Sequence, residues 1–304
     1  MLDIARMLLR EILLEVPWPE FAFNPLTSIF TPTTLYFCDR TSNVESCKEL
    51  RSIHGLDVDS RGRLWILDAP NNGTAKIVVY DLRRYNRQVV SANLAGIPTK
   101  GLTTLVIDVI NAQLGSNAYI GDPGDESIVI FNLEQAKWWK VKMEHDFRIP
   151  TVYSTDIAIS QRNSMLYITG RDTLDLFAVN LDEIRKREFT NDDETQSVNV
   201  SWLGTKMGFS SGFICDAKDG LHYFIISEKA SVRWNTYYDL KAENHLVLLQ
   251  DELVPCITDY AMDSQKSVWG LINRQCPLLS KKNTSKGIPL QFRTIKVSKY
   301  PSVF

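Results

Sequence analysis

The sequence lacks an apolar run of about 18 residues, the length that a membrane-spanning helix needs. It also lacks a cluster of basic residues, and its formal net charge is only −2 over 304 residues, which argues against nucleic acid as a partner. Only four histidines are present, and neither they nor the five cysteines have the spacing of a metal site. These absences argue against membrane insertion, nucleic-acid binding and a zinc module. No cofactor is predicted, and a monomer is expected.

Residues 1–16 also lack the composition of a secretory signal peptide. Charged side chains interrupt the apolar run that such a signal requires: Asp3, Arg6, Arg10, Glu11 and Glu15. Helical periodicity is confined to Asp3–Glu15 and, more weakly, to Asp182–Lys186. The rest of the chain has the pattern of short strands.

Strand-like apolar runs recur along the chain with a nearly constant period. They begin at Leu56, Val106, Ile157, Phe213 and Tyr260, so the steps are 50, 51, 56 and 47 residues. A second run follows each of them and carries an aromatic residue at Trp65, Tyr119, Tyr167, Tyr223 and Trp269. A period of this size in an all-β pattern is typical of a β-propeller with one four-stranded blade per repeat. The alternative is an all-β sandwich with coincidental spacing, which five repeats in register disfavour.

The blades are expected at residues 54–102, 103–150, 151–206, 207–254 and 255–304. Turn residues such as Asp219-Gly220 and Asn72-Gly73 separate their strands. The last strand of the third unit is predicted at Val198–Gly204. The fifth unit shows no obvious fourth strand after Leu290–Val297.

Four segments resemble the Yellow/major royal jelly protein family, in order along the chain. Arg51–Pro70 (RSIHGLDVDSRGRLWILDAP) is similar to the family's hallmark run, which ends in GRLWVLD. Asn117–Leu133 is similar to its Y-I-x-D segment, Ser267–Arg274 to its LWVLSNR, and Leu290–Val297 to its closing NFRI strand. The resemblance implies a six-bladed propeller secreted from arthropod cells. Residues 1–50 would then be an N-terminal segment that supplies the remnant of an incomplete first blade.

The chain departs from the family's pattern at three places. The family has a signal peptide and most of a first blade before the segment that matches Leu13–Trp18, so the chain is expected either to be truncated at its N-terminus or to have an atypical N-terminus. Arg61 stands where relatives often have a cysteine that pairs with one like Cys47, and that bond is therefore absent. Arg233 also stands where relatives often have a cysteine.

The remaining cysteines and the sequons allow further predictions. Cys38 and Cys47 lie near each other in a turn-rich stretch and are the best candidates for a disulfide. Cys215 lies in an inner-strand pattern and is expected to be a free, buried thiol. Candidate glycosylation sites are Asn72, Asn199 and Asn283.

A ligand site is expected on the propeller axis, at the face shared by the starts of the first strands and the ends of the second strands. The residues collected there make a polar, rather acidic rim, which suits a small cation with hydroxyl or amine donors. An aromatic amine would also need a stacking partner, for which Phe209 and Tyr153 are candidates. The starts supply His54, Thr103, Thr104, Thr155, Asp156, Ser211, Thr258 and Asp259, and the ends supply Asp68, Asp122, Arg171, Asp172, Glu228, Asn273 and Gln275.

The family resemblance gives this site a ligand class. Some salivary Yellow-like proteins bind serotonin and related biogenic amines in a central pocket, through contacts that correspond to Thr258 and Asn273. Relatives often have an aromatic residue where Gln275 stands. The leading hypothesis is therefore a non-catalytic protein that binds aromatic amines. Its predicted contacts are His54, Asp156, Thr258, Asp259, Asn273 and Gln275.

Catalytic alternatives remain open. The family resemblance implies dopachrome conversion in the melanin pathway as the second hypothesis, for which His54 with Asp156 or Asp259 is the only acid–base pairing available. A metal on the axis, as in six-bladed calcium lactonases, would use Asp156, Asp259 and Asn273, but turn capping by these aspartates is favoured. Gly208–Gly212 matches G-x-S-x-G but leads into a strand rather than a helix. Asp57–Asp68 has EF-hand-like spacing, with a cation at its fifth position.

Overall fold

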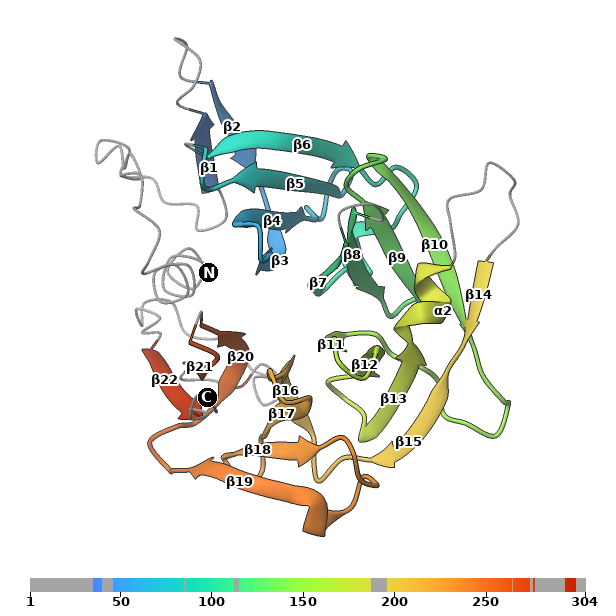
Figure 1. The fold of residues 1–304 in the computed structure, drawn as a ribbon, viewed down its shortest axis with the longest axis vertical. Helices are drawn as coiled ribbons and strands as arrows, with labels where there is room; N and C mark the ends of the chain where they lie inside the picture. The colour runs from blue at the N-terminus through green and yellow to red at the C-terminus, as the bar shows by residue number, and fades with distance from the viewer. Residues whose placement is uncertain are drawn as a thin grey trace.

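A computed structural model of the chain describes residues 35–39, 46–84, 86–111, 115–186, 196–263, 265–273, 276 and 293–298. At 35–39, 46–49, 111 and 293 it describes the backbone alone. The described residues form an all-β propeller of five blades arranged around a common axis (Figure 1). The predicted fold class is confirmed. The predicted helix at Asp3–Glu15 lies outside the described residues.

Each blade is an antiparallel sheet whose strands follow one another from the axis outward. The first blade contains β3 (Ile53–Val58), β4 (Arg63–Asp68), β5 (Lys76–Asp81) and β6 (Arg87–Asn93). The second contains β7 (Leu105–Asn111), β8 (Gly115–Asp122), β9 (Ser127–Asn132) and β10 (Lys137–Glu144). The third contains β11 (Asp156–Ser160), β12 (Met165–Thr169), β13 (Asp175–Asn180) and β15 (Ser201–Thr205). The fourth contains β16 (Ser210–Cys215), β17 (Gly220–Ile225), β18 (Ala230–Asn235) and β19 (His245–Gln250). The fifth contains β20 (Ile257–Met262), β21 (Val268–Ile272) and β22 (Arg293–Ser298).

The innermost strands pack side by side in the order β3, β7, β11, β16 and β20. A separate hydrophobic cluster fills each interface between consecutive blades. Between the first two blades, for example, Trp65 and Phe131 meet edge to face with ring centroids 6.2 Å apart. The core is thus divided into layers between blades, and burial of these apolar faces holds neighbouring blades together.

The pairing registers confirm that the five repeat aromatics occupy equivalent positions. Each aromatic lies on the second strand of its blade and pairs with a residue of the first strand. Two residues after that partner, the chain carries Asp59, Asp108, Ser160, Cys215 and Asp263, respectively. Where that residue is aspartate, the aromatic donates to it: Trp65 Nε1 to Asp59, Tyr119 Oη to Asp108, and Trp269 Nε1 to Asp263, each at 2.9 Å. The repeat therefore encodes a recurring hydrogen bond within the blade as well as a buried ring.

Cys215 occupies the same structural position as these aspartates. It is a free thiol and buried, as predicted, and burial raises its pKa well above the usual value for a cysteine. The thiolate is the reactive form of cysteine, so a raised pKa makes this thiol unreactive at neutral pH.

The prediction of one strand over Val198–Gly204 is wrong. The chain instead forms β14 (Gln196–Asn199), which pairs in parallel with β10 of the second blade, and then β15, which pairs with β13 of the third. Val198 is buried in the cluster between these two blades. One segment therefore links two neighbouring blades (Figure 1), because its side chains find apolar surface on both.

The short helix predicted near Asp182 is confirmed as α2 (Leu181–Arg185). The Asn180 side chain caps it by accepting from the backbone N–H groups of Asp182 and Glu183, and Leu181 and Ile184 are buried beneath it. Two short 3₁₀ turns, η1 (Thr99–Gly101) and η2 (Ala242–Asn244), complete the described helices. In the part of the chain that the structure describes, no helix has the length and apolar character needed to cross a membrane.

Within residues 1–50 the structure describes a two-stranded sheet of β1 (Leu35–Asp39) and β2 (Ser46–Leu50). Leu50, at the end of β2, is fully buried against Leu64, Ile66 and Tyr80, on the face of the first blade turned away from the second. The register places Cys38 opposite Cys47. Their side chains lie outside the described residues, so the disulfide between them stays a prediction.

Candidate axial site

Antiparallel pairing brings the starts of the first strands and the ends of the second strands to one end of the propeller. The terminal pairs are Ile53 with Asp68, Asp156 with Thr169, and Ile257 with Ile272. Links between blades also form at this end, where the Thr103 hydroxyl donates to the Thr155 carbonyl at 2.9 Å.

β-Bulges shape this end in three blades. The register shifts at His54 in β3, at Gly212 in β16 and at Thr258 in β20. His54 and Thr258 directly follow the first residue pair of their blades, and Gly212 follows the second pair of its blade. Gly212 has a φ of 65°, and a Cβ there would lie 2.8 Å from the Tyr260 ring. A bulge redirects a side chain out of the regular alternation. His54 and Thr258 therefore occupy equivalent positions on different blades.

Three aspartates on three different inner strands affect one another's ionisation. Asp259 on β20 raises the pKa of Asp57 on β3, and Asp156 on β11 raises the pKa of Asp259. These carboxylates lie on three of the inner strands around the axis and are near enough for their charges to repel one another. These aspartates, with His54 and Thr258, are called the axial site below.

Enclosure by protein is the largest cause of the high pKa values at the axial site. It raises the pKa of Asp57 to about 7, that of Asp259 to about 6, and that of Asp156 above the usual value. Asp259 is nonetheless exposed to solvent, and Asp57 is partly exposed. Because water reaches Asp259, it loses less solvation than Asp57 and Asp156 do, and an arriving cation would also relieve the repulsion between these carboxylates.

Two cations offset part of the negative charge. Arg171 Nε lies 3.5 Å from Asp156 Oδ2, and it lowers the pKa of both Asp156 and Asp259. Lys206 also lowers the pKa of Asp156, but it is buried and donates to the hydroxyls of Thr169 (2.6 Å) and Ser210 (2.7 Å). Burial lowers the pKa of Lys206 to about 8.

Asp57 was not among the predicted contacts. Its Oδ1 accepts from the backbone N–H of Val58 at 2.7 Å, and its Oδ2 accepts from that of Ile107, on the neighbouring blade, at 3.0 Å. The sequence pattern placed Asp57 only in the EF-hand-like run Asp57–Asp68. The usable signal was its place in an inner strand, where a charged side chain is unusual unless it meets another blade or the axis.

His54 is held by two hydrogen bonds. Its Nδ1 donates to the Leu102 carbonyl at 2.7 Å, so in the neutral ring Nε2 accepts from the Ser52 hydroxyl at 3.1 Å. Both nitrogens are occupied in fixing the imidazole between the first and second blades. This arrangement supports a positioning role for His54 and weakens its pairing with Asp156 or Asp259 as an acid–base couple.

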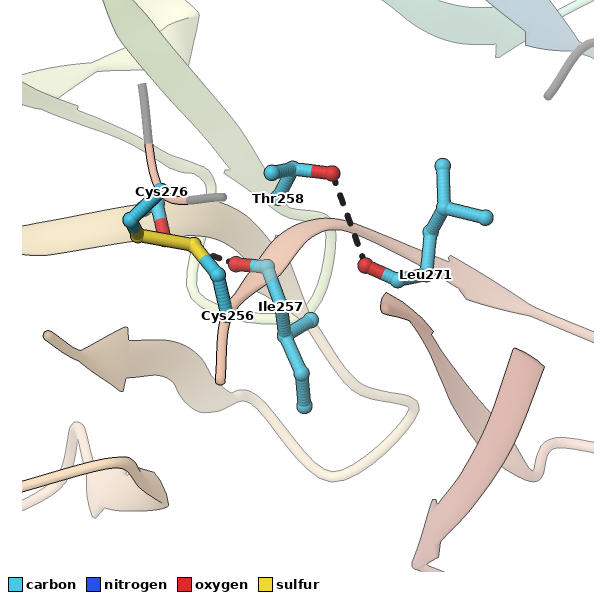
Figure 2. Close-up of a disulfide and its surroundings, with 6 residues drawn as sticks. Cys256, Ile257, Thr258, Leu271 and Cys276 are labelled. Atoms are coloured by element: carbon cyan, nitrogen blue, oxygen red, sulfur yellow. Dashed lines mark hydrogen bonds between the residues drawn. A yellow bond between two sulfur atoms is a disulfide. The ribbon is translucent and has the colours of Figure 1, made fainter. Parts of the chain in front are cut away.

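A disulfide that was not predicted borders Thr258. Cys256 and Cys276 are bonded, with their Cα atoms 5.2 Å apart (Figure 2). Beside it the Thr258 hydroxyl makes a long hydrogen bond of 3.4 Å to the Leu271 carbonyl, and the Asn273 N–H donates to the Cys256 carbonyl at 2.8 Å. The bond thus fixes the end of β21, where Asn273 lies, to the start of β20. Gln275 lies outside the described residues.

Two acidic residues of the predicted rim are neutralised by neighbours. Asp68 is buried, accepts from the backbone N–H groups of Arg51 and Ser52, and lies 3.3 Å from the Lys76 ammonium. Asp122 is paired with Lys140 at 2.9 Å. Asp68 and Asp122 therefore add little net negative charge to this end, whereas Asp172 and Glu228 of the predicted rim are exposed.

The structure also accounts for the spacings that resemble other sites. Asp59 accepts from the backbone N–H groups of Arg61 and Arg63 and from Trp65, so its oxygens serve a turn rather than a calcium ion. Ser210 begins a strand and is 1% exposed, which is not the presentation of a nucleophile elbow. Among the described residues, no group of three or more His, Cys, Asp or Glu side chains is arranged to hold a metal ion.

Comparison with known proteins identifies the family. A sequence profile described as Major royal jelly protein matches residues 51–300. The chain belongs to this family. Yellow-related salivary protein SP03 of Phlebotomus perniciosus is 24% identical over 298 residues, which cover 81% of this chain and 74% of the relative. Protein yellow of Drosophila erecta is 22% identical over 284 residues, which cover 80% of this chain and 51% of the relative.

A solved streptogramin B lyase structure matches with a TM-score of 0.50 and 10% identity, covering 81% of this chain and 68% of that one. At this identity the match shows a shared fold alone.

Arg61 and Arg233 stand at the two positions where, from the resemblance to the major royal jelly protein family, a cysteine was expected. Arg233 Nε donates to the buried Asp216 carboxylate at 2.6 Å, and His222 Nε2 bonds the same oxygen at 2.8 Å. Arg61 is more loosely placed, 4.0 Å from Glu134. At position 233, the arginine forms an ion pair within the fourth blade.

Proposed function

We propose that the axial site binds a small aromatic amine. The observation that carries the proposal is the placement of Asp57, Asp156 and Asp259 on three inner strands around the axis, near enough for Asp259 to raise the pKa of Asp57 and for Asp156 to raise that of Asp259. An ammonium group placed there would keep all three carboxylates ionised and would relieve their mutual repulsion. Neighbouring cations neutralise Asp68 and Asp122 of the rim, which leaves the axial carboxylates as the closest group of like charges on this end.

Aromatic side chains at the same end support an aromatic ligand rather than a simple cation. Tyr153 precedes the first strand of the third blade and is 42% exposed, and Phe209 precedes that of the fourth and is 51% exposed. Exposed rings beside an acidic site can stack on an aromatic ligand while its ammonium reaches the carboxylates. Thr258 and Asn273 are polar groups next to the same site, and they would serve a ring hydroxyl or indole N–H.

Isothermal titration with serotonin, dopamine and tyramine tests the proposal. We expect binding, and we expect Asp259→Asn to weaken it about ten- to a hundredfold, because a hydrogen bond to a charged group contributes about 1.5–3 kcal/mol. Asp182→Asn is the matched control, since it removes an exposed carboxylate on α2, at the opposite end of the blades. No heat of binding for any of the three amines, or equal losses in the two variants, would refute amine binding at the axis.

A second candidate function is conversion of dopachrome, with Asp57 and Asp259 as the proton-transfer pair instead of His54. The observation that favours it is the pair of raised pKa values, about 7 and about 6, because carboxyls of this kind exchange protons near neutral pH. The loss of dopachrome absorbance is the assay. A rate that is the same with and without protein eliminates this candidate.

We further propose that the protein is secreted and glycosylated. The support is membership of a family whose relatives include salivary proteins, together with sequons at Asn72 and Asn199, both exposed in the structure. Asn283 lies outside the described residues. A shift in mass on glycosidase treatment of protein secreted from insect cells would support both points, and an unmodified peptide at each sequon would refute glycosylation.

A further inference from the structure

A groove of about 680 Å³ lies between the third and fourth blades. It is bordered by Asn163, in the turn from β11 to β12, and by Thr236–Lys241, in the connection from β18 to β19. These connections lie at the end of the propeller opposite the axial site, because antiparallel strands return the chain to that end. The groove has the size of a small-molecule site.

Aromatic side chains form much of this groove. Tyr167 and Trp234 meet edge to face at 5.8 Å, and each is 3% exposed. At the mouth Tyr237 and Tyr238 follow one another and are 59% and 60% exposed. The Tyr237 hydroxyl donates to Asp219 at 3.1 Å, which fixes that ring. Aliphatic side chains complete the walls: Met165, Ala178, Leu203 and Leu240.

Uncharged polar groups stand beside these rings. Asn163 Nδ2 donates to the Thr236 hydroxyl at 3.1 Å, and Thr236 donates to the Asp219 carbonyl at 2.6 Å. Both side chains also interact with the Tyr167 hydroxyl, whose pKa burial raises to about 12. Tyr167 therefore stays neutral at physiological pH. The amide and hydroxyls of this corner can donate to or accept from a ligand.

The charged residues of the groove neutralise each other. Asp239 and Lys241 both line it, and their charged groups are 3.1 Å apart. The groove thus differs from the axial site, where three carboxylates interact with fewer cations. An ammonium ligand would lose hydration here, and the only carboxylate described in the lining, Asp239, is already paired with Lys241.

We propose that this groove is a second binding site, for an uncharged aromatic compound that carries one hydroxyl or ring N–H, of the phenol or indole class. The ring would lie among Trp234 and the exposed tyrosines, where offset or edge-to-face contacts favour aromatic partners. Its polar group would reach Asn163 and Thr236. The two ends of the propeller then select ligands by charge, with amines on the axis and neutral aromatics between the blades. The proposal does not depend on amine binding at the axis.

4-Ethylphenol and tyramine are a matched pair of probes, because they differ only by the amino group. Leu203→Trp fills the groove, and we expect it to weaken 4-ethylphenol binding about tenfold or more while leaving tyramine binding unchanged. Tyr238→Ala is a second variant that keeps the proposal testable if Leu203→Trp does not fold, because it changes only an exposed side chain. It should weaken 4-ethylphenol binding about threefold to tenfold. Asp259→Asn should leave 4-ethylphenol binding unchanged. Titration calorimetry or ligand-observed NMR gives the affinities.

Three outcomes would overturn the proposal: no binding of 4-ethylphenol at millimolar concentration, equal binding by the wild-type protein and both groove variants, or loss of 4-ethylphenol binding in Asp259→Asn. The last result would place the phenol at the axis. If tyramine fails to bind but 4-ethylphenol responds to Leu203→Trp, the proposed axial function fails and the groove site stands.

Discussion

The axial carboxylates should make amine affinity depend on pH in a range where the ligand itself does not titrate. An alkylammonium group, like that of lysine, stays protonated below pH 9. Asp259 has a pKa of about 6, so it is almost fully ionised at pH 8, half ionised at pH 6, and about one-tenth ionised at pH 5. If the amine binds only the ionised form, its apparent Kd should rise by up to about tenfold between pH 8 and pH 5, and solvent screening of the exposed Asp259 makes this an upper bound.

The perturbation that isolates this contribution is Asp259→Asn. The retained amide oxygen can still accept from the Tyr260 N–H, as Oδ1 of Asp259 does at 2.8 Å, so the local backbone should be preserved. The variant should bind tyramine more weakly at pH 8, and its Kd should change less between pH 8 and pH 5. Calorimetric titrations at pH 5, 6, 7 and 8 measure both quantities. Parallel pH profiles for the wild-type protein and the variant would refute the assignment of Asp259 to the amine.

Asp57 should make the free energy of unfolding depend on pH, an effect that can be measured separately from the pH dependence of amine affinity. Its folded pKa of about 7 exceeds the ordinary aspartate value of 3.8, so the folded state binds a proton more tightly than the unfolded state does. The free energy of unfolding should therefore fall as pH rises from about 4 to about 7 and level off above that. The full difference in pKa corresponds to about 4 kcal/mol, which solvent screening of this partly exposed group reduces to about 1–2 kcal/mol. Asp57→Asn should reduce this slope in urea denaturation, with the remainder due to the raised pKa values of Asp156 and Asp259; an unchanged slope would show that Asp57 is not enclosed as described.

Three further predictions concern the blades and the end of β21. Replacing Cys256 and Cys276 by serine should lower the free energy of unfolding by about 3 kcal/mol, since the bond closes a loop of 20 residues; an unchanged urea midpoint would contradict this. Trp65→Phe should cost about 2–4 kcal/mol and Trp269→Phe about 1 kcal/mol, because both lose a bond to aspartate but only the first ring is fully buried; equal midpoint shifts would contradict the difference. Asn273→Ala should weaken tyramine binding by up to about a hundredfold, and an unchanged calorimetric Kd would remove Asn273 from the site.

The blade repeat could be read from the sequence because it rests on local periodicity. Each aromatic from Trp65 to Trp269 marks a second strand, and the alternation around it fixes which face packs against the next blade. The division of residues 196–205 between two blades could not be read in this way. Its strand propensity is continuous, and only the positions of β10 and β13 decide that β14 joins one and β15 the other.

The site was predicted less well because its chemistry depends on contacts between blades. His54 lies on the inner strand β3, but its hydrogen bonds to the Leu102 carbonyl, 48 residues away, and to the Ser52 hydroxyl occupy both nitrogens that an acid–base role would use. The Cys256–Cys276 bond follows from the antiparallel pairing of β20 with β21, which brings the start of one strand to the end of the other. That signal was present in the predicted strands, whereas the spacing of the cysteines alone gave no reason to prefer it.

The properties of Asp57 and Asp259 show why acidic residues could not be sorted from the sequence into structural and binding roles. The Asp59 carboxylate, two residues after Asp57, accepts hydrogen bonds from a turn and from Trp65. The Asp68 carboxylate accepts from backbone N–H groups. Asp259 accepts only a local backbone N–H among the hydrogen bonds described, yet the charges of Asp156 and Arg171, on the third blade, shift its pKa. The axis collects carboxylates that the blades do not neutralise. A cation that binds there would supply the charge that the fold itself provides only in part, through Arg171 and Lys206.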